Sequence, residues 1–275
     1  MDYKRILTIQ DISCVGQCSM TVALPILSAC GIETAILPSA ILSTHTAGFS
    51  GFTFRDLCQD MPKINEHWIK EGIKFDAVYT GYLGSADQID YVLNICKTTL
   101  NKGGKLFVDP AMADNGKLYF GFDDNYVSAI KRLCQHADYI LPNITEACFL
   151  TGIEYREEYD REYIDNLVLA LKKLTNANII LTGVSFEKDR TGIIVYENEK
   201  YSYYEHEKLT NSCHGTGDIY ASSFVGAMLN GNDAYRSAKI AGDYVVKCIK
   251  ATAEENNHWY GAKFEPLLKD LIKQL

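Results

Sequence analysis

Short apolar runs alternate with longer amphipathic patterns along most of the chain. The apolar runs have the length of buried strands, and polar or glycine-containing loops follow them. We expect strands at 5–10, 34–42, 75–80, 105–108, 139–141 and 178–181. Because helical patterns separate most of these runs, their order is typical of a mostly parallel sheet with helices on both faces.

The amphipathic patterns have recognisable helix ends. Ser85 is the residue type that caps a helix N-terminus, whereas Gly31 and Gly152 stand where helical spacing stops. We expect helices at 19–30, 57–72, 85–100, 125–136, 147–151, 160–175, 217–230, 233–255 and 264–274.

The pattern changes after the sixth strand. Residues 192–196 and 201–204 alternate or run apolar around Glu197-Asn198-Glu199-Lys200, which predicts an antiparallel hairpin. No internal repeat, low-complexity tract or linker interrupts the chain. We therefore expect a single domain, residues 1–275, with three α-β-α layers and a mostly parallel central sheet that carries an antiparallel edge hairpin.

The composition excludes several classes of protein. The formal charge is −8 and the Lys and Arg residues are scattered, which argues against a nucleic-acid partner. The nine cysteines form no Cys-x-x-Cys pair and no zinc-type spacing, so we expect reduced thiols and a cytoplasmic location. The N-terminus lacks the pattern of a signal peptide, and no apolar run is long enough to span a membrane.

One stretch carries the strongest chemical signal. Residues 211–224 read Asn-Ser-Cys-His-Gly-Thr-Gly-Asp-Ile-Tyr-Ala-Ser-Ser-Phe and place two glycines directly before an apolar helix. The amides of Gly215, Thr216 and Gly217, with the positive end of the helix dipole, would form a cradle for an anion. Asp218 stands at its lip, where phosphoryl transfer needs a base for the attacking hydroxyl. The alternative is that Asp218 only caps the helix.

Further polar residues follow the other predicted strands or begin the next helix. Because the carboxyl ends of parallel strands meet at one edge of a sheet, we expect a single rim that holds Asp11, Thr46, Tyr82, Asp109, Glu146, Thr182 and Asp218. Such a rim fits a magnesium nucleotide, with Mg²⁺ bound largely through water. A turn residue at position 11 and a capping-box carboxylate at 146 remain the alternatives. The chain lacks a Walker A pattern, which excludes P-loop architectures.

Six short motifs occur in order along residues 5 to about 250. They are Ile9-Gln10-Asp11, Ser43-Thr44-His45-Thr46, Gly81-Tyr82-Leu83-Gly84-Ser85, Asp109-Pro110-Ala111-Met112, Pro142-Asn143-Ile144-Thr145-Glu146 and Gly215-Thr216-Gly217-Asp218. This order resembles the pyridoxal kinases of the ribokinase-like superfamily. The resemblance implies transfer of the ATP γ-phosphoryl group to the 5′-hydroxyl of a vitamin B6 vitamer, which is pyridoxal, pyridoxamine or pyridoxine.

The resemblance also implies a role for each matching residue. Asp218 would be the general base and the amides of 215–217 the anion hole. The implied ATP-binding residues are Asp109, Asn143, Glu146, Thr182, Gly183 and Thr216, with Asp109 and Glu146 also near Mg²⁺. The implied vitamer-binding residues are Asp11, His45, Thr46 and Tyr82. A homodimer and a monovalent cation such as K⁺ are further implications.

Asp11 departs from the family pattern, in which a serine usually follows Ile-Gln. A carboxylate there would lie beside the 4′ group of the vitamer, so we expect pyridoxamine to be used at least as well as pyridoxal, unless Asp11 pairs with a protonated ring nitrogen. A hydroxymethylpyrimidine kinase of thiamine synthesis, which shares the fold and a flat aromatic substrate, is the nearest alternative enzyme. A vitamer-binding protein without turnover is the other alternative, and the intact Asp218 argues against it.

Overall fold

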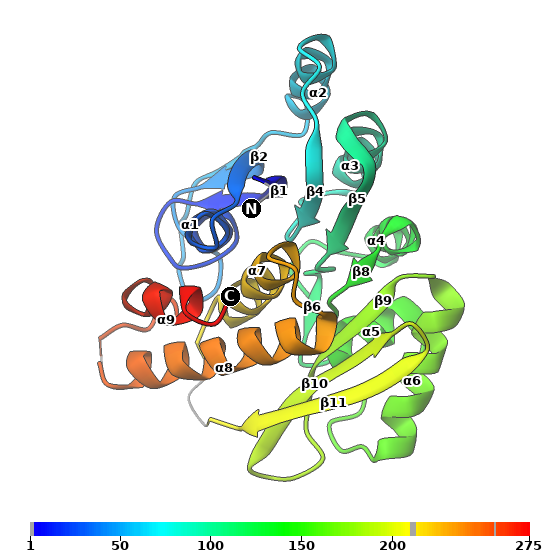
Figure 1. The fold of residues 1–275 in the computed structure, drawn as a ribbon, viewed down its shortest axis with the longest axis vertical. Helices are drawn as coiled ribbons and strands as arrows, with labels where there is room; N and C mark the ends of the chain where they lie inside the picture. The colour runs from blue at the N-terminus through cyan, green and yellow to red at the C-terminus, as the bar shows by residue number, and fades with distance from the viewer. Residues whose placement is uncertain (1–2, 210–212, 256) are drawn as a thin grey trace.

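The computed structural model describes residues 3–209, 213–255 and 257–275, and its main element is a nine-stranded sheet in the order β11-β10-β9-β8-β5-β4-β1-β2-β3 (Figure 1). The strand bounds are β1 Arg5–Ser13, β2 Glu33–Leu42, β3 Phe54–Asp56, β4 Phe75–Thr80, β5 Leu100–Val108, β8 Tyr139–Ile140, β9 Asn178–Val184, β10 Arg190–Glu197 and β11 Lys200–Glu207. The six central strands from β9 to β2 are parallel to their neighbours. Strands β3, β10 and β11 are antiparallel, so the predicted mixed sheet with an edge hairpin is confirmed.

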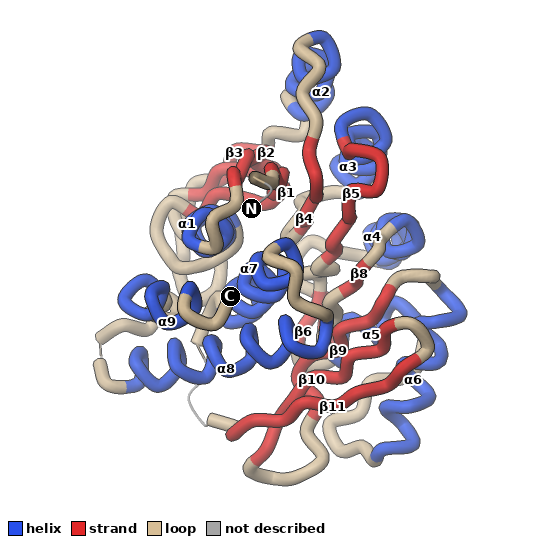
Figure 2. The backbone as a smooth tube through the Cα atoms, in the orientation of Figure 1, coloured by secondary structure: helices blue, strands red, loops and turns tan. Residues whose placement is uncertain are grey.

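Helices cover both faces of this sheet and complete the three predicted layers (Figures 1 and 2). One face carries α1 Met20–Ala29, α7 Thr216–Leu229, α8 Ala234–Ala253 and α9 Leu268–Ile272, which a 3-10 turn at Glu265–Leu267 precedes. The other face carries α2 Met61–Lys70, α3 Ala86–Thr99, α4 Asp124–His136, α5 Ile144–Thr151 and α6 Arg161–Leu174. No helix among the described residues combines the length and the apolar character needed to cross a membrane.

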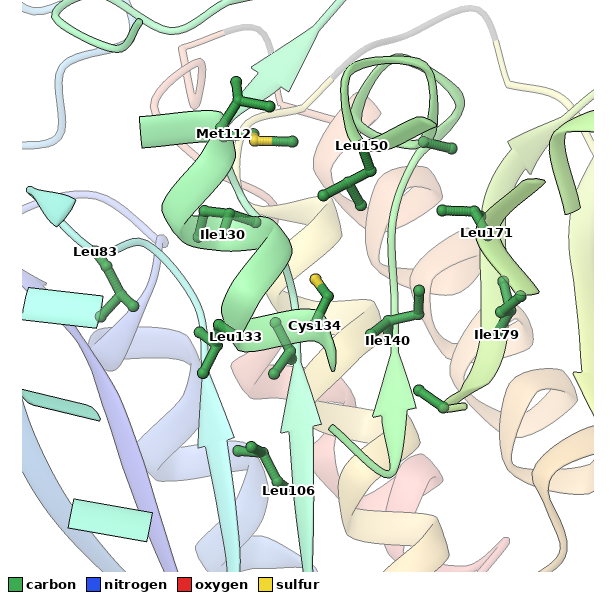
Figure 3. Close-up of a cluster of buried hydrophobic side chains, with 14 of the residues drawn as sticks. Leu83, Leu106, Met112, Ile130, Leu133, Cys134, Ile140, Leu150, Leu171 and Ile179 are labelled. Carbon is green, nitrogen blue, oxygen red and sulfur yellow. The ribbon is translucent and has the colours of Figure 1, made fainter. Parts of the chain in front are cut away.

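Each face of the sheet has its own hydrophobic core. Figure 3 shows part of the core beneath α4 and α5, where Leu106 of β5 and Ile140 of β8 point toward Ile130 and Leu150. Phe107, between two residues of that core, belongs instead to the opposite core. Alternate side chains of a strand point to opposite faces, and both faces are covered, so the buried parts of these strands appear in the sequence as mostly apolar runs.

The edge hairpin of β10 and β11 is longer than predicted. Its strands cover 190–197 and 200–207, and Asn198 and Glu199 connect them. Both turn residues have positive φ, 50° and 60°. That backbone has the twist of a two-residue hairpin turn, which explains how so short a loop joins two long strands.

Two strand ends differ from the sequence prediction. Strand β1 continues through Asp11 to Ser13, with a register irregularity between Gln10 and Ile12, so Asp11 lies within the strand rather than opening a loop. Strand β9 continues through Thr182 and Gly183, because antiparallel β10 pairs with this part of the strand. The expectation that these residues follow strand ends is therefore wrong, although they remain at the same edge of the sheet.

Several short elements were not predicted. Strand β3 and a small hairpin of β6, Ala113–Asp114, and β7, Lys117–Leu118, lie in segments expected to be loops. Two or three residues are too few for a hydrophobic period to be recognised. The helix expected from 57 begins at Met61. Met1-Asp2 and the first two residues of the 211–224 stretch lie outside the described residues.

Candidate active site

A glycine turn stands at the N-terminus of α7, as the sequence predicted. Gly215 is the N-cap residue, with φ 78°, and a Cβ there would lie 1.8 Å from the carbonyl oxygen of Gln17. Glycine is therefore required both by the backbone conformation and by a neighbouring segment. At Gly217, no described atom lies within 4 Å of an added Cβ, so the helix N-terminus opens onto free space. This arrangement suits an anion.

Asp218 lies in the first turn of α7 and is partly buried. Burial raises its pKa to about 7, and the charges of Asp109 and Asp11 act in the same direction. A hydrogen bond from the backbone of Ser19 acts in the opposite direction. The N-cap position belongs to Gly215 and has no side-chain cap hydrogen bond, so Asp218 is not the capping residue. The result is a carboxylate beside an anion cradle that can accept a proton near neutral pH.

Glu146 is a buried residue of α5 with a clear structural role. Its Oε2 accepts a hydrogen bond from the backbone N–H of Asn143 at 2.9 Å, and the Asn143 side chain accepts one from the Glu146 N–H at 2.9 Å. This is a capping box, the structural alternative considered from the sequence. The other oxygen, Oε1, accepts from the N–H of Met112 at 3.1 Å and so fixes the segment after β5.

Asp109 follows β5 and forms a coupled acidic pair with Glu146. Burial raises the pKa of both carboxyl groups, and for Asp109 the charge of Glu146 adds to the effect. A nearby cation would stabilise the charged form of two buried carboxylates that repel each other. Among the residues that the structure describes, no group of three or more His, Cys, Asp or Glu side chains is arranged to hold a metal ion. Two carboxylates alone can bind Mg²⁺ only if it keeps most of its water ligands.

A cavity of about 730 Å³ lies between the start of α5 and the end of β9. Asn143, Thr182 and Gly183, three of the predicted ATP-binding residues, line it. The backbone of Thr182 donates to the carbonyl of Pro142 at 2.9 Å, which holds the two walls together. Lys188 and Lys208 also line the cavity and were missed, because lysines in exposed loops have no distinguishing pattern. A volume of this size accepts a nucleotide.

The predicted vitamer residues come from β1 and from the loops after β2 and β4. Asp11 is 5% exposed, its Oδ2 accepts from the Ser13 hydroxyl at 2.9 Å, and burial raises its pKa. Tyr82 is partly buried, and burial followed by the charge of Asp11 raises its pKa. His45 is buried near Asp11. Thr46, by contrast, is exposed. The structure thus brings Asp11, Tyr82 and His45 together and leaves Thr46 at the margin.

Ser19 joins the two sides of the site and was not identified from the sequence beyond marking a helix start. It is the N-cap of α1, but its side chain makes no capping hydrogen bond. Its hydroxyl lies near Asp11 and its backbone near Asp218, where each lowers the pKa of the neighbouring carboxyl. Its φ of 52° is uncommon for a residue other than glycine. Ser19 therefore links the predicted base to the predicted substrate carboxylate.

Comparison with known proteins places this geometry in a family. The family model described as phosphomethylpyrimidine kinase matches residues 27–263. A pyridoxal kinase of Dictyostelium discoideum is 29% identical over 244 residues, which cover 81% of this chain and 77% of that protein.

Two solved structures have closely similar folds. Pyridoxal kinase from Lactobacillus plantarum has a TM-score of 0.91 at 30% identity, covering 98% of this chain and 97% of that one. A provisionally assigned phosphomethylpyrimidine kinase from Bacteroides thetaiotaomicron, solved with pyridoxal, has a TM-score of 0.92 at 33% identity, covering 98% and 96%.

Proposed function

The chain belongs to the phosphomethylpyrimidine kinase family, and we propose that it transfers the γ-phosphoryl group of ATP to the 5′-hydroxyl of a vitamin B6 vitamer. One observation carries this proposal: Asp218 lies in the first turn of α7, whose N-terminus is open, and close enough to Asp109, which follows β5, and to Asp11 of β1 for their charges to act on it. The relatives named as pyridoxal kinases, and the related structure solved with pyridoxal, support the choice of vitamer.

In the proposed reaction Asp218 accepts the proton of the 5′-hydroxyl. The hydroxyl oxygen then bonds to the γ-phosphorus, and the bond from that phosphorus to the ADP oxygen breaks. The amides of Gly215, Thr216 and Gly217 stabilise the charge of the transferred group. Asp109 and Glu146 would hold hydrated Mg²⁺, which would supply charge neutralisation for the phosphates. A pKa of about 7 for Asp218 suits a base that works near neutral pH.

The cavity between α5 and β9 is the proposed ATP site. Asn143, Thr182 and Gly183 line it, and Thr216 of α7 would contact the phosphates. A monovalent cation such as K⁺ is a further proposed cofactor, on the family resemblance alone. We also propose that residues 1–275 act as one kinase domain in the cytoplasm, in keeping with nine free cysteines.

Release of ADP with each candidate substrate tests the function. Purified protein with Mg²⁺ and ATP should release ADP with pyridoxal, pyridoxamine or pyridoxine, and a phosphorylated vitamer should accumulate in equal amount. Turnover with hydroxymethylpyrimidine alone would identify a thiamine-pathway kinase instead. Vitamer binding without ADP release would identify a binding protein and contradict the proposal.

Asp11 gives the proposal a specificity prediction. A carboxylate about 4 Å from an ammonium gains up to about 4 kcal/mol at an effective dielectric of 20, less the cost of removing both from water. A surplus of about 1.4 kcal/mol is tenfold in specificity. We expect pyridoxamine to be used at least as well as pyridoxal, and Asp11→Ser to lower the pyridoxamine-to-pyridoxal ratio of kcat/KM about tenfold. An unchanged ratio would show that Asp11 does not read the 4′ amine.

We further propose that the protein is a homodimer. Apolar side chains are exposed around the β2–β3 edge of the sheet, which is consistent with a surface covered by a second copy. They are Val15 at 52%, Ile41 at 39%, Phe52 at 37% and Phe54 at 52% exposure. Light scattering should give about twice the chain mass of 30.8 kDa, and Phe54→Glu should shift that mass toward the single chain. A single-chain mass for the wild type at micromolar concentration would contradict the proposal.

A further inference from the structure

The segment 257–262 connects α8 to the 3-10 turn and crosses the loops of the proposed vitamer site. The carbonyl of Tyr260 lies 2.7 Å from Nε2 of His45, in the loop after β2. The N–H of Ala262 donates to the carbonyl of His214, beside the glycine turn, at 3.1 Å. The segment is therefore attached to both sides of the site by hydrogen bonds.

The hydrogen bonds of His45 define its tautomer. The backbone N–H of Ala47 donates to Nδ1 at 3.2 Å, so Nδ1 carries no proton in this arrangement. The proton is on Nε2, which donates to the Tyr260 carbonyl. The His45 side chain is 4% exposed, and both ring nitrogens are bonded to the chain itself. Neither nitrogen is then left to contact a vitamer, which changes the role that the family resemblance implies for this residue.

Tight packing accompanies these hydrogen bonds. The ring of Phe49 lies 5.0 Å from that of His45 and 4.6 Å from that of Trp259, measured between centroids. A Cβ at Gly48 would lie 2.8 Å from the Trp259 ring, and one at Gly16 would lie 2.1 Å from Cδ2 of His45. The loop and the 257–262 segment thus fit against each other closely, and glycine permits the approach on the loop side.

His45 also lies near the glycine turn proposed for catalysis and near Asp11, which is proposed for vitamer binding. The rings of His45 and His214 are 5.3 Å apart, and His214 immediately precedes Gly215. His45 also lies close to Asp11. The vitamer must lie between Asp11 and Asp218 in the proposed reaction. The spacing between the loop after β2 and the glycine turn therefore determines how its ring and its 5′-hydroxyl are placed.

We propose that His45 is a positioning residue that fastens the 257–262 segment across the vitamer site and thereby sets the width of that site. This inference rests on the proposed function and assigns to His45 a role other than direct substrate binding. The proposed nucleotide cavity is lined by residues within 114–115, 143–145, 155–159 and 182–188 and by Lys208, and no residue of 257–262 lines it. Loss of the hydrogen bond from His45 to Tyr260 should therefore weaken vitamer binding and leave ATP binding unchanged.

Two substitutions separate the hydrogen bonds of His45. His45→Asn keeps an acceptor near the Nδ1 position for the Ala47 N–H but loses the donor to Tyr260. His45→Gln keeps a donor near the Nε2 position. One lost hydrogen bond of about 1 kcal/mol corresponds to about fivefold in a binding constant. We expect His45→Asn to raise the KM for the vitamer about fivefold or more, with the KM for ATP unchanged, and His45→Gln to restore most of the loss.

Hydrogen exchange supplies a readout that needs no substrate. In His45→Asn the backbone amides of 257–262 should exchange faster, including that of Ala262, and in His45→Gln they should exchange as in the wild type. His136→Asn is a matched control, because His136 is exposed at the end of α4 and should change neither readout. Equal KM increases in both His45 variants, without faster exchange, would show direct vitamer binding and overturn the proposal. Absence of kinase activity would refute the proposed function, whereas unchanged exchange in His45→Asn would refute the fastening.

Discussion

Replacing Asp218 by asparagine should slow the chemical step by about 10²–10⁴, the usual effect of losing a positioned general base. ATP and vitamer binding should stay within severalfold of the wild type, because Asn has nearly the same shape and Gly215 retains the N-cap position. Single-turnover phosphorylation measures the chemical step, and equilibrium titration with each ligand measures binding. Near-normal turnover would remove Asp218 from the mechanism.

The pH dependence of the same variant provides an independent check. Only the deprotonated carboxylate can accept a proton, and burial raises the pKa of Asp218 to about 7. The wild-type kcat/KM should therefore rise with pH toward neutrality and level off above it, falling about tenfold per unit on the acid side. The residual activity of Asp218→Asn should lack this limb. A limb that persists unchanged would assign the titration to another group.

Asp109→Asn and Glu146→Gln should each raise the Mg²⁺ concentration needed for half-maximal activity by about tenfold or more. The two variants should differ in their effect on stability. Glu146→Gln should also lower stability by about 1–3 kcal/mol, because its amide N–H₂ would face the N–H of Met112 or Asn143 at a buried site. Asp109→Asn should cost much less stability, since Asp109 Oδ1 accepts one backbone hydrogen bond, from Ala111 at 3.1 Å, which the amide oxygen of Asn can also accept, and burial disfavours the charge that the substitution removes.

Activity against Mg²⁺ concentration and denaturant unfolding together measure this contrast. Asp90→Asn is a suitable control, because Asp90 is an exposed residue of α3 paired with Arg132. The control should leave the Mg²⁺ requirement unchanged. If Glu146→Gln lowered stability and left the Mg²⁺ requirement at the wild-type value, Glu146 would be a capping residue only. The same result for Asp109→Asn would show that Asp109 does not bind the metal.

The parallel sheet, and the placement of polar residues at one edge of it, could be predicted because the physics that forms them is local. A strand covered on both faces is mostly apolar, so polar residues gather near its end. Asp109 after β5 and Tyr82 after β4 follow this rule. The glycine turn could also be predicted. A positive φ at Gly215 and the close approach of Gln17 both exclude a side chain there, so the position requires glycine.

The parts that the sequence did not reveal depend on contacts between distant segments. Strand β9 is extended by its neighbour β10, not by its own apolar pattern. Ser19 has the residue type of a helix cap, and only the fold turns its hydroxyl to Asp11. The 257–262 segment has no hydrophobic period. Its position depends on a hydrogen bond with His45, a residue far away in the chain.

The close approach of Gln17 to Gly215 has a consequence for the order in which the protein is made. Strand β1, an interior strand of the sheet, is translated well before α7 and α8, which cover its face. Until those helices emerge from the ribosome, one apolar face of the growing sheet stays exposed, and such intermediates are prone to aggregate. The anion cradle cannot form either, because Gln17 and Gly215 lie far apart in the chain. Folding of the core and appearance of activity should therefore coincide, once α7 and α8 have been translated.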